Sequence, residues 1–216
     1  GGAKVHQNAR GRIMKDNTYG SIEEDAMRRD FTCNALYYDP EKEEILDFHN
    51  GMADIAERKL VMIGHAAERY QEDPVRILRA IRLSGKLGFE LSQATAGPIA
   101  ESIGRLKHEP VARLFDEIMK LLFSGHAREC LKRLKEFDVP DDIHPLFNAL
   151  NISDGMDGKM IGLALKNTDE RLRADKSVSV GFVLAALMWP ELNRHWKVNL
   201  QQGLKPSHAL SEAMNT

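Results

Sequence analysis

The chain has 216 residues, of which 43% are hydrophobic and 29% charged, and its formal net charge at pH 7 is −2. This composition is typical of a folded protein with a buried core, and it excludes a disordered polymer and a strongly charged tail. Two cysteines exclude a disulfide-rich secreted scaffold and favour a reducing, cytoplasmic setting. No apolar run approaches the roughly 18 residues of a membrane span. The first 20 residues are polar, without the apolar segment of a signal peptide, and are expected to form a loop.

The first third of the chain has the pattern of a mixed α/β unit. Ser21 and Glu24 form a capping-box pattern, which predicts a short helix that ends near Arg29. The apolar runs 33–38 and 45–48 are separated by a turn sequence, and they predict two strands of a β-hairpin. A short helix and a further short strand are then expected over residues 52–59 and 60–63.

From about residue 66 the apolar residues recur with the period of an α-helix, which predicts packed helices for the rest of the chain. Helix starts are predicted at Asp73-Pro74 and at Pro110. A late helix that begins near residue 180 is expected to end near Pro190. Residues 151–159 contain several glycines and aspartates and are the best candidate for a linker.

Two dense polar clusters are the candidates for chemistry. The first spans residues 23–32, EEDAMRRDFT, and contains Arg28, Arg29 and Asp30. Guanidinium groups donate paired hydrogen bonds to phosphates, and a carboxylate accepts hydrogen bonds from ribose hydroxyls, so this cluster suits a nucleotide. The alternative is a solvated run of charges that pair with one another.

The second cluster spans residues 72–82, EDPVRILRAIR. On a helix, one arc would carry cations and another would carry apolar residues that face the core. The cations are Arg76, Arg79, Arg82 and Lys86, and the apolar residues are Ile77, Leu78 and Ile81. Such a basic stripe suits a polyanion such as ATP or RNA.

Asp73 and Arg76 lie three residues apart across the predicted helix start. Together they offer the hydrogen-bonding pattern that an adenine edge requires: the carboxylate accepts from the N6 amino group while the guanidinium donates to N1. The alternative is that Asp73 only caps the helix and that Arg76 pairs with it or with Glu72.

The sequence contains no pattern for a metal site or for a nucleophilic residue. The eight histidines are scattered, and CxxC, HxxxH, HExxH, GxSxG, GxGxxG and Walker-loop spacings do not occur. We therefore assign no catalytic residue and no metal ligand.

In their order along the chain, these clusters resemble motifs of the class II nucleotidyltransferases, the family of CCA-adding enzymes and bacterial poly(A) polymerases. Residues 28–38, RRDFTCNALYY, resemble the RRDFTxNALxY motif, and residues 47–55 resemble the motif that follows it. Residues 72–76, EDPVR, match the EDxxR nucleobase motif of the neck. Residues 110–117 are similar to the next neck helix.

Three features favour the poly(A) polymerase branch. Residues 16–32 are similar to its DNxxGxxEEDAxRRDFT run, residues 36–38 to its LYY ending, and residues 166–171, KNTDER, to a segment of its body domain. A CCA-adding enzyme and a non-catalytic helical RNA-binding module are the alternatives.

The resemblance implies template-independent addition of AMP from ATP to RNA 3′ ends. Arg28, Arg29 and Asp30 would contact the sugar and phosphates of ATP, and Asp73 and Arg76 would contact the adenine edge. Two further roles follow from the same motifs: nucleotide binding by Arg79, and RNA binding by Arg82, Lys86 and Arg113.

The fold that the resemblance implies is mainly α. A small α/β remnant of the nucleotidyltransferase head, residues 1–65, would be followed by an all-helical neck, residues 66–150, and a helical body, residues 151–216. In this family a paired-aspartate DxD motif, in an earlier part of the head, holds two Mg²⁺ ions. No such motif precedes Arg28. We therefore expect the chain alone to bind ATP weakly and not to polymerise.

Overall fold

The computed structural model describes residues 6–7, 13–15, 21–150 and 155–215. The first part combines short strands with short helices. Its elements are β1 (His6–Gln7), β2 (Ile13–Lys15), α1 (Ile22–Arg28), the 3-10 helix η1 (Thr32–Asn34), β3 (Leu36–Asp39), β4 (Glu44–Asp47), α2 (Gly51–Ala56) and β5 (Lys59–Leu60). β1 pairs with β2 and β3 with β4, both antiparallel, while β5 pairs in parallel with β6 (Glu90–Leu91).

The rest of the described chain is helical apart from β6. Its elements are α3 (Ala66–Glu72), α4 (Val75–Leu87), α5 (Gln93–Ala96), α6 (Ile99–Ser102), η2 (Ile103–His108), α7 (Val111–Leu122), α8 (Ala127–Glu136), η3 (Asp141–Ile143), α9 (Pro145–Leu150), α10 (Gly155–Arg173), α11 (Val180–Gln201) and α12 (Pro206–Met214). The predicted fold class, mainly α with a small α/β part at the start, is confirmed.

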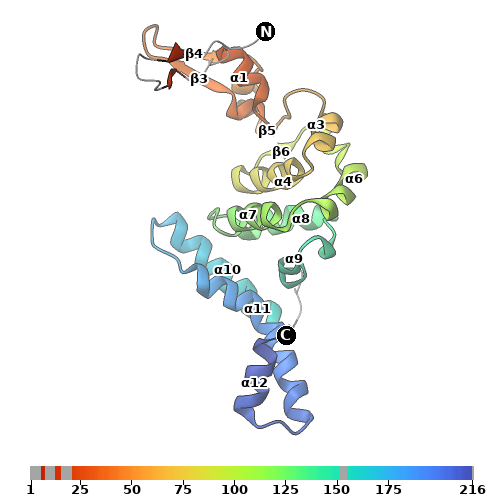
Figure 1. The fold of residues 1–216 in the computed structure, drawn as a ribbon. Coiled ribbons are helices and arrows are strands. Elements are labelled where there is room, and N and C mark those ends of the chain that lie inside the picture. The colour runs from red at the N-terminus through yellow and green to blue at the C-terminus, as the bar shows by residue number, and fades with distance from the viewer. Residues whose placement is uncertain (1–5, 8–12, 16–20, 151–154, 216) are drawn as a thin grey trace.

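The elements follow one another along an elongated molecule (Figure 1). The β3–β4 hairpin and α1 lie at one end, α4, α7 and α8 form the middle, and α12 packs against α11 at the other end. No described helix is both long and apolar enough to cross a membrane.

The capping box predicted at the start of α1 is present. The Ser21 hydroxyl accepts from the backbone N–H of Glu24, and the Glu24 carboxylate accepts from that of Ser21, at 3.2 and 3.1 Å. The predicted hairpin is also present, with Leu36 opposite Asp47. Its first strand is shorter than expected, because residues 32–34 form a 3-10 turn before it begins.

The motif at residues 47–55 packs directly against the RRDFT motif. Asp47 accepts the backbone N–H groups of Gly51 and Met52, at 2.8 and 2.9 Å, and so caps α2. A Cβ atom at Gly51 would lie 2.3 Å from the carbonyl oxygen of Thr32, so only glycine allows this close approach. The Thr32 hydroxyl in turn donates to Asp54 at 2.6 Å.

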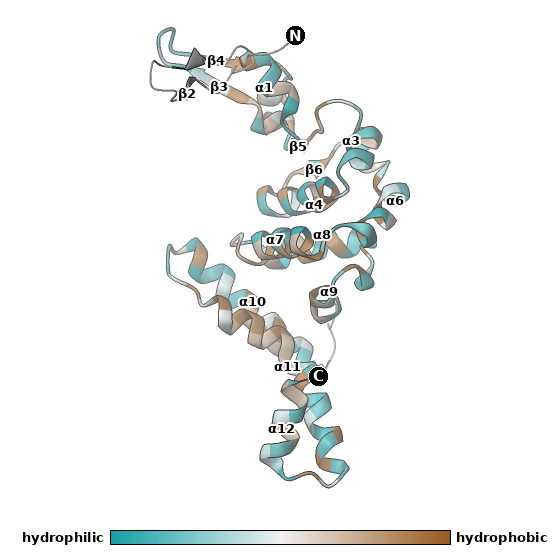
Figure 2. Ribbon diagram, viewed as in Figure 1, coloured by the Kyte–Doolittle hydropathy of each residue, from teal (hydrophilic) through white to brown (hydrophobic). Residues whose placement is uncertain are grey.

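The amphipathic helices expected after residue 66 pack into one continuous core. Figure 2 shows hydrophobic and hydrophilic residues alternating around α4, α7 and α8, as expected for helices that are buried on one side. In α4 the three predicted apolar residues, Ile77, Leu78 and Ile81, are all buried. The core extends from Phe31 to Leu187 and thereby joins the first part of the chain to α10 and α11.

The prediction that the late helix ends near Pro190 is wrong. α11 continues through Pro190 to Gln201. A proline in a helix removes one backbone hydrogen bond and costs about 3 kcal/mol. Pro190 is buried and α11 packs against α9, α10 and α12, so tertiary contacts offset that cost.

Two further expectations are corrected in part. Residues 155–159 of the expected linker are helical, since α10 begins at Gly155. Packing of this long helix on α11 stabilises it despite the glycines. Residues 151–154 lie outside the described residues. The expected loop at residues 1–20 contains the paired strands β1 and β2, and the rest of that stretch, including the DNTYG sequence of residues 16–20, also lies outside the described residues. These two strands pair through their backbones, and the polar sequence has no alternation of apolar residues from which the pairing could be predicted.

The close packing of α4 on α8 depends on Gly85 of α4. A Cβ atom at this position would lie 2.7 Å from the Cα atom of Cys130 in α8. Because backbone cannot yield as a flexible side chain does, a larger residue would push the two helices apart.

We therefore expect Gly85→Ala to lower the free energy of unfolding by about 1–3 kcal/mol, as overpacking does. Gly162→Ala is the matched control: Gly162 is also helical, has no atom within 4 Å of its ideal Cβ, and should gain up to about 1 kcal/mol from helix propensity. Urea unfolding followed by circular dichroism measures both. Equal stability of the two variants would contradict the close crossing.

Candidate functional site

The RRDFT motif is held against residues 61–63 by backbone hydrogen bonds. The carbonyl of Asp30 accepts from the N–H of Ile63 at 2.9 Å, and the N–H of Thr32 donates to Val61 at 3.0 Å. Phe31 and Met62 form an isolated antiparallel bridge between the same segments. This pairing places Asp30 next to α3 and α4.

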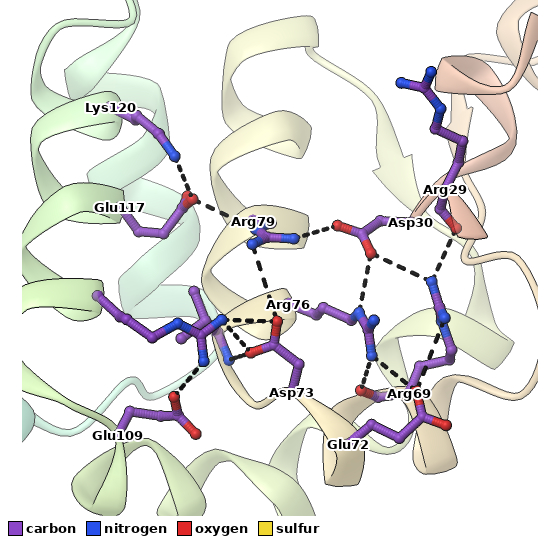
Figure 3. Close-up of polar contacts among 12 residues, drawn as sticks. Arg29, Asp30, Arg69, Glu72, Asp73, Arg76, Arg79, Glu109, Glu117 and Lys120 are labelled. Carbon is purple, nitrogen blue, oxygen red and sulfur yellow. Dashed lines mark hydrogen bonds and ion pairs between the residues drawn. The ribbon is translucent and has the colours of Figure 1, made fainter. Parts of the chain in front are cut away.

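The Asp30 carboxylate accepts hydrogen bonds from three arginines of α3 and α4 (Figure 3). One oxygen accepts from Nε of Arg76 at 3.0 Å and from Nη2 of Arg69 at 3.4 Å. The other accepts from Nη1 of Arg79 at 2.7 Å. The Asp30 side chain is only 17% exposed, so these are charge-assisted bonds in a partly desolvated site.

Arg69 is a residue that the sequence analysis did not identify. Its guanidinium also donates to the carbonyl of Arg29 at 2.9 Å, and its own carbonyl accepts from Nη1 of Arg76. Its spacing to Glu72 indicated only an ordinary helix-surface ion pair. No local sequence pattern predicts the contact of Arg69 with Asp30, because the two residues are 39 positions apart.

Asp73 is held from the opposite side, by α7. Nη2 of Arg113 donates to both carboxylate oxygens of Asp73, at 3.0 and 2.9 Å, while Nη1 donates to Glu109 at 2.7 Å. The hydrogen bond to Asp73 raises the pKa of Arg113. One Asp73 oxygen also accepts the N–H of Val75 at 3.2 Å. α4 begins at Val75, so Pro74 is its N-cap residue and not its first helical residue. By accepting the N–H of Val75, the Asp73 side chain also caps the helix, as the alternative interpretation of this residue expects.

Glu117 of α7 is the second residue that the sequence analysis did not identify. Its side chain is 4% exposed, and it accepts from Arg82 at 3.1 Å and from Lys120 at 3.2 Å. Arg79 lies 3.5 Å away as an ion-pair partner. A buried carboxylate needs such partners, because an unpaired buried charge is costly.

The cationic arc of α4 is consequently not a bare basic surface. Arg76, Arg79 and Arg82 are each paired with carboxylates from other elements or from the preceding turn. Lys86 is exposed and has no ion-pair partner among the described residues. The structure thus brings Asp30, Asp73, Arg76, Arg79, Arg82 and Arg113 into one cluster.

Arg28 and Arg29 do not join this cluster through their side chains. Both pair with Asp25 on α1, and Figure 3 shows the Arg29 side chain directed away from Arg76 and Arg79. Hydrogen bonds from Tyr37 and Arg29 lower the pKa of Asp25. The Arg29 guanidinium also lies 6.0 Å from the centre of the Tyr37 ring.

The cluster offers both acceptors and fixed donors to a ligand. Arg76 is held by Asp30, Glu72 and the carbonyl of Arg69, and its Nη2 atom makes no hydrogen bond within the described part of the chain. The Asp73 carboxylate lies at the start of the same helix and is the acceptor that the cluster offers. Within that part of the chain, no group of three or more His, Cys, Asp or Glu side chains could hold a metal ion.

Two family models match the chain. Residues 3–61 match the "Poly A polymerase head domain", and residues 88–150 match the "Probable RNA and SrmB- binding site of polymerase A".

Curated relatives match over most of the chain. It is 39% identical over 208 residues to poly(A) polymerase I of Salmonella typhimurium, an alignment that covers 95% of this chain and 45% of the relative. It is 40% identical over 116 residues to the CCA-adding enzyme of Bacillus cytotoxicus, covering 54% of this chain and 29% of that enzyme. The chain thus spans less than half the length of these relatives.

A solved tRNA nucleotidyltransferase, complexed with a primer tRNA and an incoming ATP analog, has a similar fold. Its TM-score is 0.59 at 27% identity, and the match covers 78% of this chain and 50% of that one.

The cluster predicts a large effect of Asp30→Asn on stability. An amide would leave three guanidinium groups short of their common acceptor, so we expect the free energy of unfolding to fall by about 3 kcal/mol, near the lower end of the cost of breaking a buried ion pair. Asp25→Asn is the matched control, because Asp25 also pairs with arginines but its side chain is 43% exposed, against 17% for Asp30; its cost should be about 1 kcal/mol or less. Urea unfolding measures both, and a similar small cost at both positions would contradict the central role of Asp30.

Proposed function

Because the chain is a homologue of the bacterial poly(A) polymerases and the CCA-adding class II nucleotidyltransferases, we propose that it forms the base-reading and RNA-holding part of a poly(A) polymerase. In that reaction the 3′-oxygen of an RNA forms a bond to the α-phosphorus of ATP. The bond between that phosphorus and the bridging oxygen of the β-phosphate breaks, pyrophosphate leaves, and the 3′-hydroxyl loses its proton. The RNA becomes one adenylate longer without a template.

The observation that carries this proposal is the arrangement of Asp73 and Arg76 at the start of α4. Arg113 fixes the carboxylate from one side, and Asp30 and Glu72 fix the guanidinium from the other. Such fixed groups lose little side-chain freedom when a base binds. In our proposal Asp73 accepts from N6 of adenine, and Arg76 donates to N1.

Asp30 is proposed to contact the ribose, with Arg28 and Arg29 on the phosphates. A carboxylate has about four lone-pair directions, and the three arginine bonds leave one of them for a ribose hydroxyl. The exposed side chains of Arg28 and Arg29 have only the surface carboxylate Asp25 as an ion-pair partner within the described chain. Phosphate can displace or share such a weak surface pair.

Arg79 is proposed to join the nucleotide site, and Arg82, Lys86 and Arg113 are proposed to hold the RNA backbone. Lys86 fits this role best, because it is exposed and without an ion-pair partner in the described part of the molecule. The division into head remnant (1–65), neck (66–150) and body (151–216), and the cytoplasmic setting, belong to the same proposal.

The family implies Mg²⁺ as the cofactor that supports phosphoryl transfer. The described residues include no group that fits a metal ion, so we derive no step through it. The role proposed for this chain is to bind and orient the nucleotide and the RNA. Aligned coverage favours the poly(A) polymerase over the CCA-adding enzyme, because the former matches 95% of the chain and the latter 54%.

Base reading by Arg76 predicts a loss of nucleotide discrimination in Arg76→Ala. The ratio of ATP to CTP affinity, measured by calorimetry on this chain, should fall about 5- to 150-fold, which corresponds to the roughly 1–3 kcal/mol that a good bidentate base contact contributes. Arg105→Ala is the control, since Arg105 is exposed and has no ion pair with the described residues. An unchanged ratio in a folded Arg76→Ala protein would leave Arg76 with a structural role only.

The length of the relatives predicts the behaviour of the chain in an extension assay. With ATP, Mg²⁺ and an RNA primer, we expect ATP to bind weakly and the primer not to be extended, because the chain covers 45% of the relative and offers no metal site within its described residues. Gel analysis of labelled primer measures extension. Robust tails would contradict this expectation, and incorporation of CTP would favour the CCA-adding alternative.

A further inference from the structure

The KNTDER segment, residues 166–171, is not used by the proposed nucleotide site. It lies on α10, where one side of the segment contacts α8 and the other lines a cavity. On one side the buried Asp169 accepts the backbone N–H groups of Ala127 and Arg128, at 2.8 and 3.3 Å. His126, the N-cap residue of α8, makes no side-chain cap. Asp169 therefore caps α8 from another helix and fixes α10 against the neck.

The other side of the segment lines a cavity of about 430 Å³ where α10 ends and α11 begins. Its lining residues come from both helices and from the loop between them: Asn167, Thr168, Arg171, Ser177, Val178, Ser179 and Phe182. Because Asp169 anchors the same helix, the position of this cavity relative to the neck is fixed.

Arg171 is a fixed cation in this cavity. Its Nε and Nη2 atoms donate to the carbonyl of Ser177, at 2.9 and 2.8 Å. No carboxylate pairs with it among the described residues, and its Nη1 atom has no partner there. An arginine that is held in place by a neutral carbonyl keeps its full charge and free N–H donors for an anion.

Phe182 supplies an aromatic surface to the lining of the same cavity. It lies in the first turn of α11, and 56% of its area is exposed. The exposed Asn167 adds an amide that makes no hydrogen bond to the described residues. One cavity thus holds an exposed ring, an arginine and a free amide. Proteins bind unpaired RNA with this combination, by stacking a ring on the base and pairing a cation with the phosphate.

We propose that this cavity binds one nucleotide of single-stranded RNA, in an RNA site separate both from the Asp73–Arg76 nucleotide site and from the proposed backbone contacts at Arg82, Lys86 and Arg113. The base stacks on Phe182, Asn167 contacts its edge, and Arg171 contacts the phosphate. This proposal rests on the proposed function in taking RNA as the ligand. A free nucleotide offers the same chemistry, so the test separates the two sources.

The test measures the affinity of this chain for fluorescein-labelled oligo(A) by anisotropy. Phe182→Leu, which keeps an apolar side chain, should weaken binding about 5- to 150-fold, as loss of one base–aromatic stack does. Trp189→Leu is its control, because Trp189 is an exposed aromatic residue on the same helix outside the cavity. Arg171→Lys keeps the charge but loses the paired bonds to Ser177, and it should weaken binding as well.

Titrations of the same variants with ATP and AMP separate this proposal from the proposed function. We expect free-nucleotide affinity to be unchanged in Phe182→Leu and Arg171→Lys. If oligo(A) affinity is also unchanged in both, or if the unmodified chain does not bind oligo(A), the cavity is not an RNA site. If the variants lose AMP or ATP affinity instead, the ligand is a free nucleotide and the RNA assignment is overturned. The effect of Arg76→Ala on ATP against CTP tests the proposed function independently of these outcomes.

Discussion

The contact of Asp30 with three arginines is the interaction on which the candidate site depends. Asp30 belongs to the first part of the chain, whereas Arg69, Arg76 and Arg79 belong to α3 and α4. Backbone pairing of residues 30–32 with 61–63 brings the carboxylate to this position, and the arginines then connect it to α3 and α4. Charges in a partly desolvated site are tolerated only when each has partners, so Asp30 fixes the three guanidinium groups and they fix it. The motifs that look separate in the sequence therefore form one structural unit.

A second set of contacts supports this unit from α7. Arg113 holds Asp73, and the buried Glu117 holds Arg82 and approaches Arg79. Because neighbouring positive and negative groups alternate through the cluster, each cation lies close to a carboxylate and the local field is largely balanced. This pairing explains how one face of α4 can carry three arginines without strong mutual repulsion. It also leaves the groups that we propose to read the base, Asp73 and Arg76, in one fixed geometry.

Local structure was predictable from the sequence, and the partners of the charged residues were not. The capping box at Ser21, the hairpin and the buried arc of Ile77, Leu78 and Ile81 follow from short-range patterns, and all are present. The roles of Arg69 and Glu117 could not be predicted, because their contacts join residues that are distant in the sequence. Arg69 and Asp30 are 39 positions apart, and Arg82 and Glu117 are 35 apart. The continuation of α11 through Pro190 could not be predicted either, because tertiary packing there outweighs the tendency of proline to end a helix. The resemblance named the candidate residues, but only the structure separates the side chains of Arg28 and Arg29 from the cluster around Asp30.

The central claim is that Arg76, held by Asp30 and Glu72, donates to the base of ATP. The most direct measurement is an NMR titration of the ¹⁵N-labelled chain with ATP and with CTP, observing the arginine side-chain N–H signals. The account predicts that ATP shifts the Arg76 signals, that CTP shifts them differently, and that the signals of the exposed Arg105 stay in place. If ATP binds while the Arg76 signals do not move, the account is contradicted.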